Sequence, residues 1–354
     1  MVQFSVLNFI KSQWTPVPPA PKVDLHGQTV VVVGANTGIG FEAATHFARM
    51  GPGRLILACR SLERGSVALA KLEASTDCKT AELWLLDLSS FESVRAFADR
   101  IEQEVQRLDI LIANAAVVPN QFEETGDHWE TSVQVNHISP ALLIILLMPK
   151  MFASLDESPR SPRIVVVSSS LHHYAKIPDN VFESSTPLQV LSDKDLSPPF
   201  EAMPRYYLAK LFNVFLTLSL TDHIPCVTTV AVNPGFCYSD LRRDTRTLVI
   251  RALERALAFT AEEGSRQIVW AALYSRAAPG EKVNCMKGAF VSYMSVGEPS
   301  DFVLSDEGTA FREKLWQETL EIVKYCCGAA LTWDRSKAAL GSAANNHAIE
   351  YLTQ

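Results

Sequence analysis

Short, unbroken apolar runs alternate along the chain with longer segments whose apolar positions recur every three to four residues. The first run, QTVVVVG at 28–34, is rich in β-branched residues and predicts a buried strand. The next segment, GIGFEAATHFARM at 38–50, has the spacing of a helix and stops at GPG. Similar runs predict further strands at 54–60, 81–88, 108–115, 163–170 and 227–235. Helical spacing or length predicts further helices at 62–74, 91–105, 141–148 and 206–220.

This alternation of strands and helices predicts an α/β fold. Strands that are apolar throughout their length are buried on both faces, which is typical of a parallel sheet covered by helices. Right-handed crossovers between successive strands then give a doubly wound, Rossmann-type parallel sheet in a single domain. Sheets of this type bind ligands beyond the carboxyl ends of their strands, so functional residues are expected there.

Composition narrows the class of protein. The 354 residues are 47% hydrophobic and 20% charged, which is ordinary for a soluble globular chain with a sizeable core. The net charge of −7, without a clustered basic stripe, argues against nucleic acid as a partner. The 7 cysteines, an odd number with no C-x-x-C pair, indicate neither a disulfide framework nor a zinc site. We therefore expect reduced thiols, no bound metal and a cytoplasmic protein.

The two ends of the chain lie outside the sheet pattern. Residues 1–23 contain a mildly amphipathic stretch, FSVLNFIKSQW, followed by a proline-rich linker. That stretch would either contact a membrane peripherally or pack on the body of the protein. The strand–helix pattern occupies 24–325, and 326–354 is expected to form a C-terminal tail. No secretory signal is visible, and the strongest apolar run, at 141–148, is far shorter than the roughly 20 residues that span a bilayer.

Three glycines stand where the first predicted strand passes into the first predicted helix. In VVVVGANTGIG, Gly34, Gly38 and Gly40 lack side chains where the backbone must approach a ligand closely. The helix that begins here directs its free N–H groups and its dipole at whatever binds, which suits a pyrophosphate. The spacing is G-x-x-x-G-x-G, but its place in the first strand–turn–helix unit makes it a strong dinucleotide signal. The predicted cofactor site also includes Asn36, Thr37 and Ile39.

GANTGIG resembles the cofactor turn of the short-chain dehydrogenase/reductase family almost letter for letter. The resemblance extends over residues 27–325 and is strongest to the retinol-dehydrogenase-like and fungal branch, through LACRSLERG, LDLSSFESVRAFA, VNHISP, NPGF and REKLWQET. It implies a nicotinamide cofactor and hydride transfer between an alcohol and a ketone or aldehyde. Family members often pair through the helices at 139–155 and 205–221, so a homodimer is a further expectation.

The end of the second predicted strand bears on which nicotinamide cofactor is bound. An NAD site presents Asp or Glu there to the ribose 2′-hydroxyl. Here Cys59 takes that place and Arg60 follows, and a guanidinium pairs with a 2′-phosphate that a carboxylate would repel. We therefore predict NADP(H), with Ser61 adding a hydrogen bond. The alternative is that Arg60 is a solvated surface charge.

Other cofactor contacts are implied by the resemblance. Asp87 and Leu88, after the third strand, match the pair that borders the adenine, although Asp87 could instead be an ordinary helix N-terminal residue. The family's N-N-A-G after the fourth strand reads ANAA here. Asn114 remains, and Ala116 replaces the terminal glycine, a small change that we expect binding to survive. The segment that closes over the nicotinamide in the family contains Pro234, Gly235 and Ser239.

The stretch RYYLAK predicts the catalytic group. Tyr206 and Lys210 are four residues apart on a helix and share a face, but Tyr207, three residues before the lysine, could also approach it. The family pattern Y-x-x-x-K selects Tyr206 as the proton donor to the carbonyl oxygen, with Lys210 also bonding the nicotinamide ribose. A free tyrosine has a pKa of about 10, so its use near pH 7 requires nearby positive charge, which the Lys210 ammonium and the oxidised nicotinamide would supply.

Two further positions match the family's catalytic set. The fifth predicted strand ends in three serines, and alignment to the family selects Ser169 to hold the substrate oxygen, with Ser168 and Ser170 as alternatives. Asn136 in VNHIS matches the asparagine whose main chain holds a proton-relay water in the family.

An insertion separates the catalytic residues. Ser169 and Tyr206 are 37 positions apart (206 − 169), several times the separation common in the family. Loops as long as 171–205 within a compact domain are usually functional or disordered. We predict a flap over the substrate pocket, and the alternative is an outward-facing disordered loop. His172 and His173, at its start, have no third ligand at metal spacing, so a packing or surface role is expected for them.

Together these features predict an NADP(H)-dependent oxidoreductase that interconverts an alcohol and a ketone or aldehyde on an apolar small molecule, by analogy in secondary metabolism. The alternative is a catalytically weak cofactor-binding scaffold at a membrane surface. Ala116 favours that alternative slightly, whereas the intact Ser169, Tyr206 and Lys210 oppose it. Sugar epimerisation or dehydration uses a similar Tyr–Lys pair, but the chain length and the NPGF loop fit alcohol oxidation better.

Overall fold

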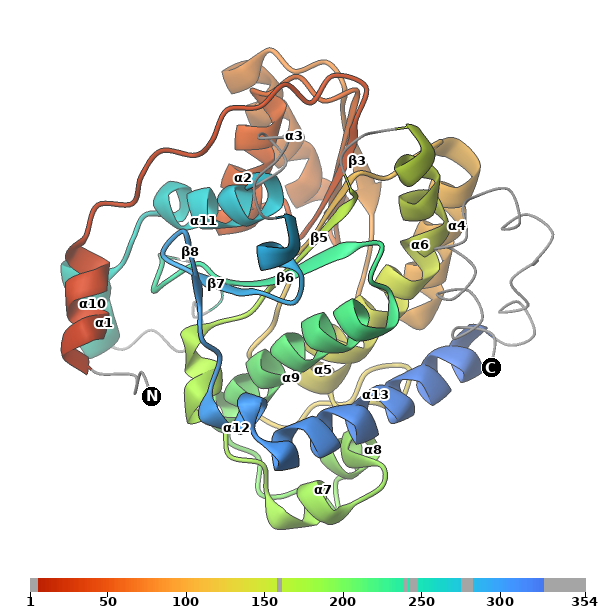
Figure 1. Ribbon diagram of the computed structural model, residues 1–354, viewed down its shortest axis with the longest axis vertical. Helices are drawn as coiled ribbons and strands as arrows, with labels where there is room; N and C mark the ends of the chain where they lie inside the picture. The colour runs from red at the N-terminus through yellow and green to blue at the C-terminus, as the bar shows by residue number, and fades with distance from the viewer. Residues whose placement is uncertain (1–5, 158–160, 239–240, 242–247, 275–282, 328–354) are drawn as a thin grey trace.

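The computed structural model describes residues 6–157, 161–238, 241, 248–274 and 283–327 (Figure 1). Within these ranges its centre is one sheet of 8 strands in the order β3-β2-β1-β4-β5-β6-β7-β8. Neighbouring strands run parallel except β7 and β8, which are antiparallel. The strands are β1 Thr29–Val33, β2 Arg54–Cys59, β3 Ala81–Leu85, β4 Ile110–Ala113, β5 Arg163–Val167, β6 Thr228–Asn233, β7 Phe290–Ser292 and β8 Ser295–Gly297. The predicted Rossmann-type sheet is confirmed, with the short strands β7 and β8 as additions that the sequence pattern does not predict.

Helices cover both faces of this sheet. Side chains alternate along β1, so that Val31 and Val33 pack into one hydrophobic cluster while Val30 and Val32 pack into the other. Residues of α4, α6 and α9 share the first cluster, and residues of α2, α3 and α11 share the second (Figure 1). These helices are α2 Gly38–Ala48, α3 Leu62–Thr76, α4 Phe91–Glu104, α6 Ser139–Glu157, α9 Ala202–His223 and α11 Ala261–Leu273.

Helix α6 contains the strongest apolar run of the chain. The helical stretch Thr131–Leu155 is long and apolar enough to cross a membrane by composition, but 72% of its most apolar window is buried inside the protein. Leu142, Ile144 and Met148 have no exposed surface. An all-round apolar helix in this position is a core helix of the layer that covers the sheet.

The N-terminal stretch forms helix α1 (Val6–Trp14), which lies beside α10 (Leu248–Leu257) at the edge of the molecule (Figure 1). The structure therefore shows the alternative in which this stretch packs on the body of the protein. At the other end, α13 (Asp306–Cys327) lies against α9, with the Phe311 ring 6.2 Å from that of Phe212. Helix α13 also contacts α6, so it lies against both of the helices through which a homodimer is expected, and the homodimer stays a prediction. Of the predicted tail, 326–354, the first two residues form the last turn of α13, and the rest lies outside the described residues.

The insertion folds into short helices that pack on α13. These are α7 (Asp179–Glu183) and α8 (Pro187–Ser192). The buried carboxylate of Glu318, on α13, accepts hydrogen bonds from the backbone N–H groups of Leu188, at 2.7 Å, and Gln189, at 2.9 Å, at the start of α8. Three side chains of the insertion belong to the hydrophobic core, namely Val181, Leu188 and Leu191. The disordered-loop alternative is therefore wrong, and the flap over the substrate pocket stays a prediction.

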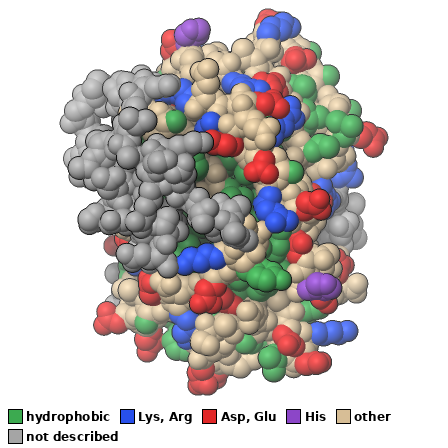
Figure 2. Space-filling view, turned by 90° about the vertical axis from the view of Figure 1, so that its right-hand side faces the viewer, with side chains coloured by type: hydrophobic (Ala, Val, Ile, Leu, Met, Phe, Trp, Pro, Cys, Tyr) green, Lys and Arg blue, Asp and Glu red, His purple; other side chains and the backbone are tan. Residues whose placement is uncertain are grey.

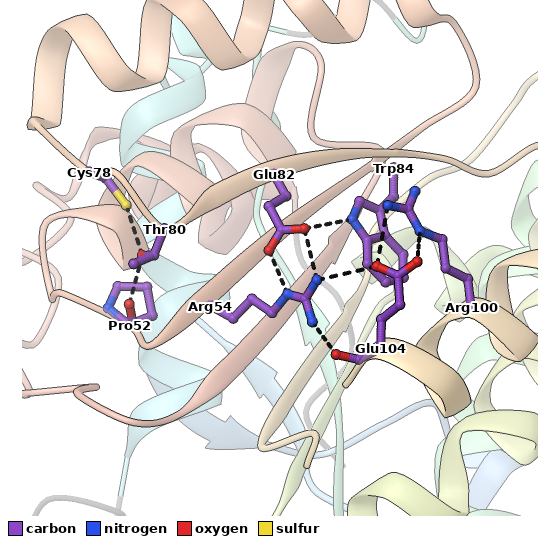
Figure 3. Close-up of polar contacts among 8 residues, drawn as sticks. All are labelled: Pro52, Arg54, Cys78, Thr80, Glu82, Trp84, Arg100 and Glu104. Atoms are coloured by element: carbon purple, nitrogen blue, oxygen red, sulfur yellow. Dashed lines mark hydrogen bonds and ion pairs between the residues drawn. The ribbon is translucent and has the colours of Figure 1, made fainter. Parts of the chain in front are cut away.

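Charged side chains around an indole fasten the edge strand β3 to β2 and α4 (Figure 3). The Arg54 guanidinium donates to both carboxylate oxygens of Glu82, at 2.5 and 2.9 Å, and Trp84 Nε1 donates to the same carboxylate at 3.0 Å. Arg100, which pairs with Glu104 at 2.9 Å, lies over the Trp84 ring, 3.8 Å from its centroid. Arg54 begins β2, whereas the glycine turn follows the end of β1, so this cluster supports the sheet at a distance from the predicted site.

The side of the molecule that carries α4 and α6 mixes both signs of charge (Figure 2). Acidic and basic side chains are interspersed over its visible part, with hydrophobic side chains between them. Nucleic-acid sites present a basic stripe or patch. The described residues of this face do not form such a stripe.

Candidate active site

The glycine turn has the backbone shape that a dinucleotide site needs. Gly34 and Gly38 have φ values of +76° and +59°, a region that residues with side chains rarely adopt. Gly40, in the first turn of α2, lies so close to the Gly34 carbonyl and the Asn114 amide that a Cβ atom would clash with both. Asn114 Nδ2 donates to the carbonyl oxygens of Val33, at 3.1 Å, and Gly34, at 3.3 Å, and so ties the turn to the end of β4. This glycine geometry is the one that the sequence predicts for a pyrophosphate at the start of α2, and the binding itself stays a prediction.

Replacing Gly40 with alanine is expected to weaken dinucleotide binding by about tenfold or more, because the new methyl group must push Gly34 and Asn114 apart. Overpacking of this kind also costs about 1–3 kcal/mol of stability. Titration with NADPH and a thermal melt measure the two effects. Gly126→Ala is the matched control, because a Cβ there meets no atom within 4 Å. Equal NADPH affinity in Gly40→Ala and the wild type would contradict a cofactor cradle at this turn.

The end of β2 carries the residues predicted to select the cofactor. Cys59 is buried, and burial raises the pKa of its thiol to about 11, so it is a neutral packing residue. Arg60 follows it and is exposed. Ser61 caps α3, since its hydroxyl accepts a hydrogen bond from the Arg64 N–H at 3.3 Å. The fold thus puts a guanidinium directly after β2 and a helix N-terminus beside it.

Asp87 and Leu88 follow β3. The Asp87 carboxylate accepts hydrogen bonds from the backbone N–H of Ser89, at 2.9 Å, and from its hydroxyl, at 2.6 Å, which closes an Asx turn. The capping residue of α4 is Ser90, so Asp87 shapes the turn before the helix. The Leu88 side chain is buried in the core, which leaves its backbone as the part that can face a ligand.

Asn136 lies in a π-helical turn, η1 (Gln134–Ile138), directly before α6. Its carboxamide clamps the backbone of Val117: the Val117 N–H donates to Oδ1 at 2.8 Å, and Nδ2 donates to the Val117 carbonyl at 2.9 Å. Turns of this type are frequent at functional sites. Because the side chain is committed to this clamp, a proton-relay role would fall to the main chain of Asn136, as the family pattern implies.

The structure separates two of the three serines after β5. Ser168 is buried, and its hydroxyl donates to the Lys210 carbonyl oxygen at 2.8 Å, so it faces α9 and not a substrate. Ser169 is half-buried, and its hydroxyl oxygen accepts from the Leu171 N–H at 3.2 Å. A hydroxyl that accepts one hydrogen bond can still donate its proton to another oxygen. Ser169 and Ser170 therefore remain the candidates to hold a substrate oxygen.

Lys210 is buried at the end of β5. Its Nζ atom donates to the Val167 carbonyl oxygen at 2.8 Å and lies 5.4 Å from the centre of the Tyr206 ring. Burial lowers the pKa of the ammonium to about 7. Tyr206 is half-buried one helical turn earlier, whereas the Tyr207 ring lies 6.2 Å from the ring of Tyr174. This geometry supports the choice of Tyr206 as the partner of the lysine.

Asn213 is a site residue that the sequence pattern does not single out. Its Nδ2 atom donates to the Val167 carbonyl oxygen at 3.2 Å, the same acceptor that Lys210 uses. Its position three residues after Lys210 puts it on the same face of α9, which is the one signal by which it could have been found. Two donors on one carbonyl fix the end of β5 to α9.

His172 has a structural role, as expected. Burial lowers the pKa of its imidazole to about 3, so the ring is neutral. The Ser300 N–H donates to Nε2 at 3.0 Å, which leaves the proton on Nδ1 for the Ser169 carbonyl oxygen at 2.7 Å. The rings of His173 and Phe290 lie 4.1 and 4.7 Å away. Among the described residues, no group of three or more His, Cys, Asp or Glu side chains is placed to hold a metal ion.

The loop after β6 follows Asn233. Gly235 has a φ of +84°, and its N–H donates to Asn233 Oδ1 at 3.2 Å. Gln267, on α11, donates to the Pro234 carbonyl oxygen at 3.1 Å. Pro234 and Gly235 are thus held at the same edge of the sheet as the glycine turn and Lys210. Ser239, also expected in this site, lies outside the described residues.

Comparison with known proteins assigns these features to one family. Residues 28–185 match the family model described as short chain dehydrogenase. The chain is 34% identical over 322 residues to the short chain dehydrogenase/reductase dmxR8 of Cryptosporiopsis sp. (strain 8999), with 89% of this chain and 96% of that protein covered. It is similar to the crystal structure of an uncharacterised protein from Mycobacterium paratuberculosis, with a TM-score of 0.64, 26% identity, and 88% and 98% of the two chains covered. It also shares the fold of a protein from Escherichia coli CFT073 described as a short chain dehydrogenase complexed with NADPH, with a TM-score of 0.57, 21% identity, and 78% and 100% covered.

Proposed function

Because the chain belongs to the short-chain dehydrogenase/reductase family, we propose that it is an NADP(H)-dependent oxidoreductase that interconverts an alcohol and a ketone or aldehyde on an apolar small molecule. The observation that carries the proposal is the buried Lys210 beside Tyr206, at the same edge of the sheet as the glycine turn. Burying an ammonium costs the free energy of its hydration. Ionisable groups whose pKa is strongly shifted by burial cluster at functional sites. A secondary-metabolic role is proposed by analogy alone.

The residues that would hold the cofactor suit its phosphates. The turn from Gly34 to Gly40 presents backbone at the start of α2, where a Cβ would fill the space. Arg60 would pair with the 2′-phosphate, and Asn114 keeps the turn in place. When bound, the nicotinamide supplies or accepts the hydride that changes the oxidation state of the substrate.

The side chains of the site divide the acid–base work. In reduction the Tyr206 hydroxyl donates its proton to the carbonyl oxygen, and in oxidation the phenolate takes it back. The Ser169 hydroxyl donates a hydrogen bond to the same oxygen and stabilises the negative charge that develops there. The Lys210 ammonium, 5.4 Å from the Tyr206 ring centre, stabilises the phenolate. The main chain of Asn136 holds the water through which the proton exchanges with solvent.

Exposed apolar side chains near Tyr206 support an apolar substrate. Met203, three residues earlier on α9, is 40% exposed. Tyr174, whose ring lies beside that of Tyr207, is 46% exposed. Tyr174 belongs to the insertion, whose later part is anchored on α13. We therefore place the insertion at one wall of the substrate pocket.

Arg60→Ala tests the choice of cofactor. The variant is expected to bind NADPH about 10–100-fold more weakly, because a hydrogen bond to a charged group contributes about 1.5–3 kcal/mol. NADH, which lacks the 2′-phosphate, should bind within about twofold of the wild type. Fluorescence titration with both dinucleotides measures this, and Lys79→Ala, which removes another exposed cation, is the control. A wild-type protein that prefers NADH would refute the NADP(H) assignment.

Turnover distinguishes the enzyme from a cofactor-binding scaffold. The wild-type protein is mixed with NADPH and a panel of apolar ketones and aldehydes, and NADPH consumption is followed; alcohols with NADP⁺ test the reverse direction. Consumption that depends on the carbonyl compound is the expected result. NADPH binding without turnover of any substrate on the panel would favour the scaffold.

A further inference from the structure

One side chain of the N-terminal helix is buried among three distant parts of the fold. Gln13, in the last turn of α1, is 5% exposed. Its Nε2 atom donates to the carbonyl oxygens of Phe236, at 2.9 Å, and Leu257, at 2.8 Å. Its Oε1 atom accepts from the Phe236 N–H, at 3.1 Å, and from the Tyr293 hydroxyl, at 3.0 Å. The carboxamide thus uses both of its donors and both lone pairs of its oxygen.

The contact with Phe236 holds the loop that follows β6. A single carboxamide bonds both the N–H and the C=O of Phe236, as a neighbouring strand would. The preceding Gly235 has a φ of +84°, and a Cβ there would lie 3.1 Å from Gln13 Oε1 and 2.8 Å from the Phe259 ring. Gln13 therefore packs directly on the turn of this loop.

The contact with Tyr293 is to a strained hairpin turn. Tyr293 and Met294 connect β7 to β8 with φ values of +51° and +54°. A two-residue turn of this shape favours asparagine and glycine, and it persists with two large side chains only where the surroundings hold it. The hydroxyl bond to Gln13 and the Phe259 ring, 6.3 Å from that of Tyr293, are contacts that hold it.

The segment that follows α1 is fixed as well. Val17 is buried against Cys237 and Phe259. The Arg266 guanidinium, on α11, donates to the Val17 carbonyl oxygen at 2.7 Å. The backbone that carries Gln13 is thus anchored to the same loop from a second point, so Gln13 acts from a fixed position.

We propose that Gln13 is a positioning residue for the cofactor site. It holds Phe236, and with it the loop from Asn233 to Cys237, in the shape that receives the nicotinamide end of the dinucleotide. The inference rests on the proposed function, which puts this loop over the nicotinamide. Without the carboxamide, the Phe236 N–H loses its bond to Gln13 Oε1, while the Phe236 carbonyl keeps its bond from the Phe259 N–H at 2.8 Å. The loop is then held by fewer contacts and leaves this shape for part of the time. The apparent affinity for the cofactor then falls in proportion to the fraction of molecules that keep it.

Gln13→Ala tests this through two readouts. In the protein without cofactor, amide hydrogen exchange at Phe236 is expected to accelerate by about tenfold or more, because the N–H no longer bonds to Gln13 Oε1. The affinity for NADPH in a fluorescence titration is expected to fall by about tenfold, and the KM for NADPH to rise more than kcat falls. Trp14→Phe is the matched control. Trp14 is the next residue, is 69% exposed, and bonds through Nε1 to the Ala256 carbonyl of α10 at 3.1 Å. Both readouts should stay within about twofold in that variant.

The outcomes separate this inference from the proposed function. Wild-type exchange at Phe236 and wild-type NADPH affinity in Gln13→Ala would overturn the inference and leave the proposed function standing. A wild-type protein that binds neither NADPH nor NADH would refute the proposed function, and the exchange rate at Phe236 would still show whether Gln13 holds the loop. Should Gln13→Ala fail to fold, Gln13→Met keeps the length of the side chain and loses all four hydrogen bonds. Wild-type exchange and affinity in Gln13→Met would overturn the inference equally.

Discussion

Tyr206→Phe is expected to lower the turnover number by about 10²–10⁴-fold, the contribution typical of a positioned general acid. The affinity for NADPH should stay within about twofold, because the substitution removes one hydroxyl and leaves the ring beside Lys210. The turnover number is measured with the best carbonyl compound of the panel at saturating NADPH, and the affinity by fluorescence titration.

Tyr207→Phe is the matched control for this loss. The two tyrosines are adjacent on α9, but the Tyr207 ring lies beside Tyr174 and not over the lysine. The proposed mechanism gives the Tyr207 hydroxyl no part in proton transfer, so turnover should change by no more than a few-fold. Full turnover in Tyr206→Phe together with loss of turnover in Tyr207→Phe would show that Tyr207, and not Tyr206, is the proton donor. That result would also show that the family pattern selects the wrong member of the pair.

The first six strands were predictable because each has its own local signal. Strand β1, Thr29–Val33, falls within the strand predicted at 28–34. Four consecutive valines signal a strand that is buried on both faces, as in a sheet covered by helices. Strands β7 and β8 carry no such signal. Each has three residues, and β7 (Phe290–Ser292) is a strand because it pairs with the end of β6.

In the candidate site, the residue types were predictable from the sequence but their neighbours were not. A run of three serines does not reveal that Ser168 bonds the Lys210 carbonyl, because that contact depends on how α9 lies against β5. Gln13 and Phe236 are 223 positions apart, and Glu318 and Leu188 are 130 apart. Contacts at such separations come from the packing of whole elements and leave no periodicity in the sequence.

Lys210→Met is expected to lower turnover by about 10²-fold or more and, at pH 7, to raise the free energy of unfolding by up to about 4 kcal/mol. Burial lowers the pKa of Lys210 to about 7, whereas a lysine in an unfolded chain keeps a pKa of about 10.4. Folding therefore works against the charge, and methionine, of similar length, removes that cost. The Val167 carbonyl loses one donor but keeps Asn213 at 3.2 Å, so the substitution leaves it paired.

The pH dependence of the stability difference between the wild type and Lys210→Met tests whether burial of the ammonium is its cause. Between pH 7 and about pH 10 the unfolded wild-type chain binds a proton that the folded chain has released, so wild-type stability rises with pH relative to Lys210→Met. Below pH 7 Lys210 is protonated in both the folded and the unfolded wild-type protein. The wild type is then less stable than Lys210→Met by the largest amount. Chemical denaturation of both proteins across this range measures the difference. A difference that does not change with pH would show that folding does not lower the pKa of Lys210. A variant that is less stable than the wild type at acidic pH would show that the fold stabilises the ammonium, for which the Val167 carbonyl is the acceptor. Loss of turnover with a gain in stability is instead the result expected of a charge that is buried for its chemistry.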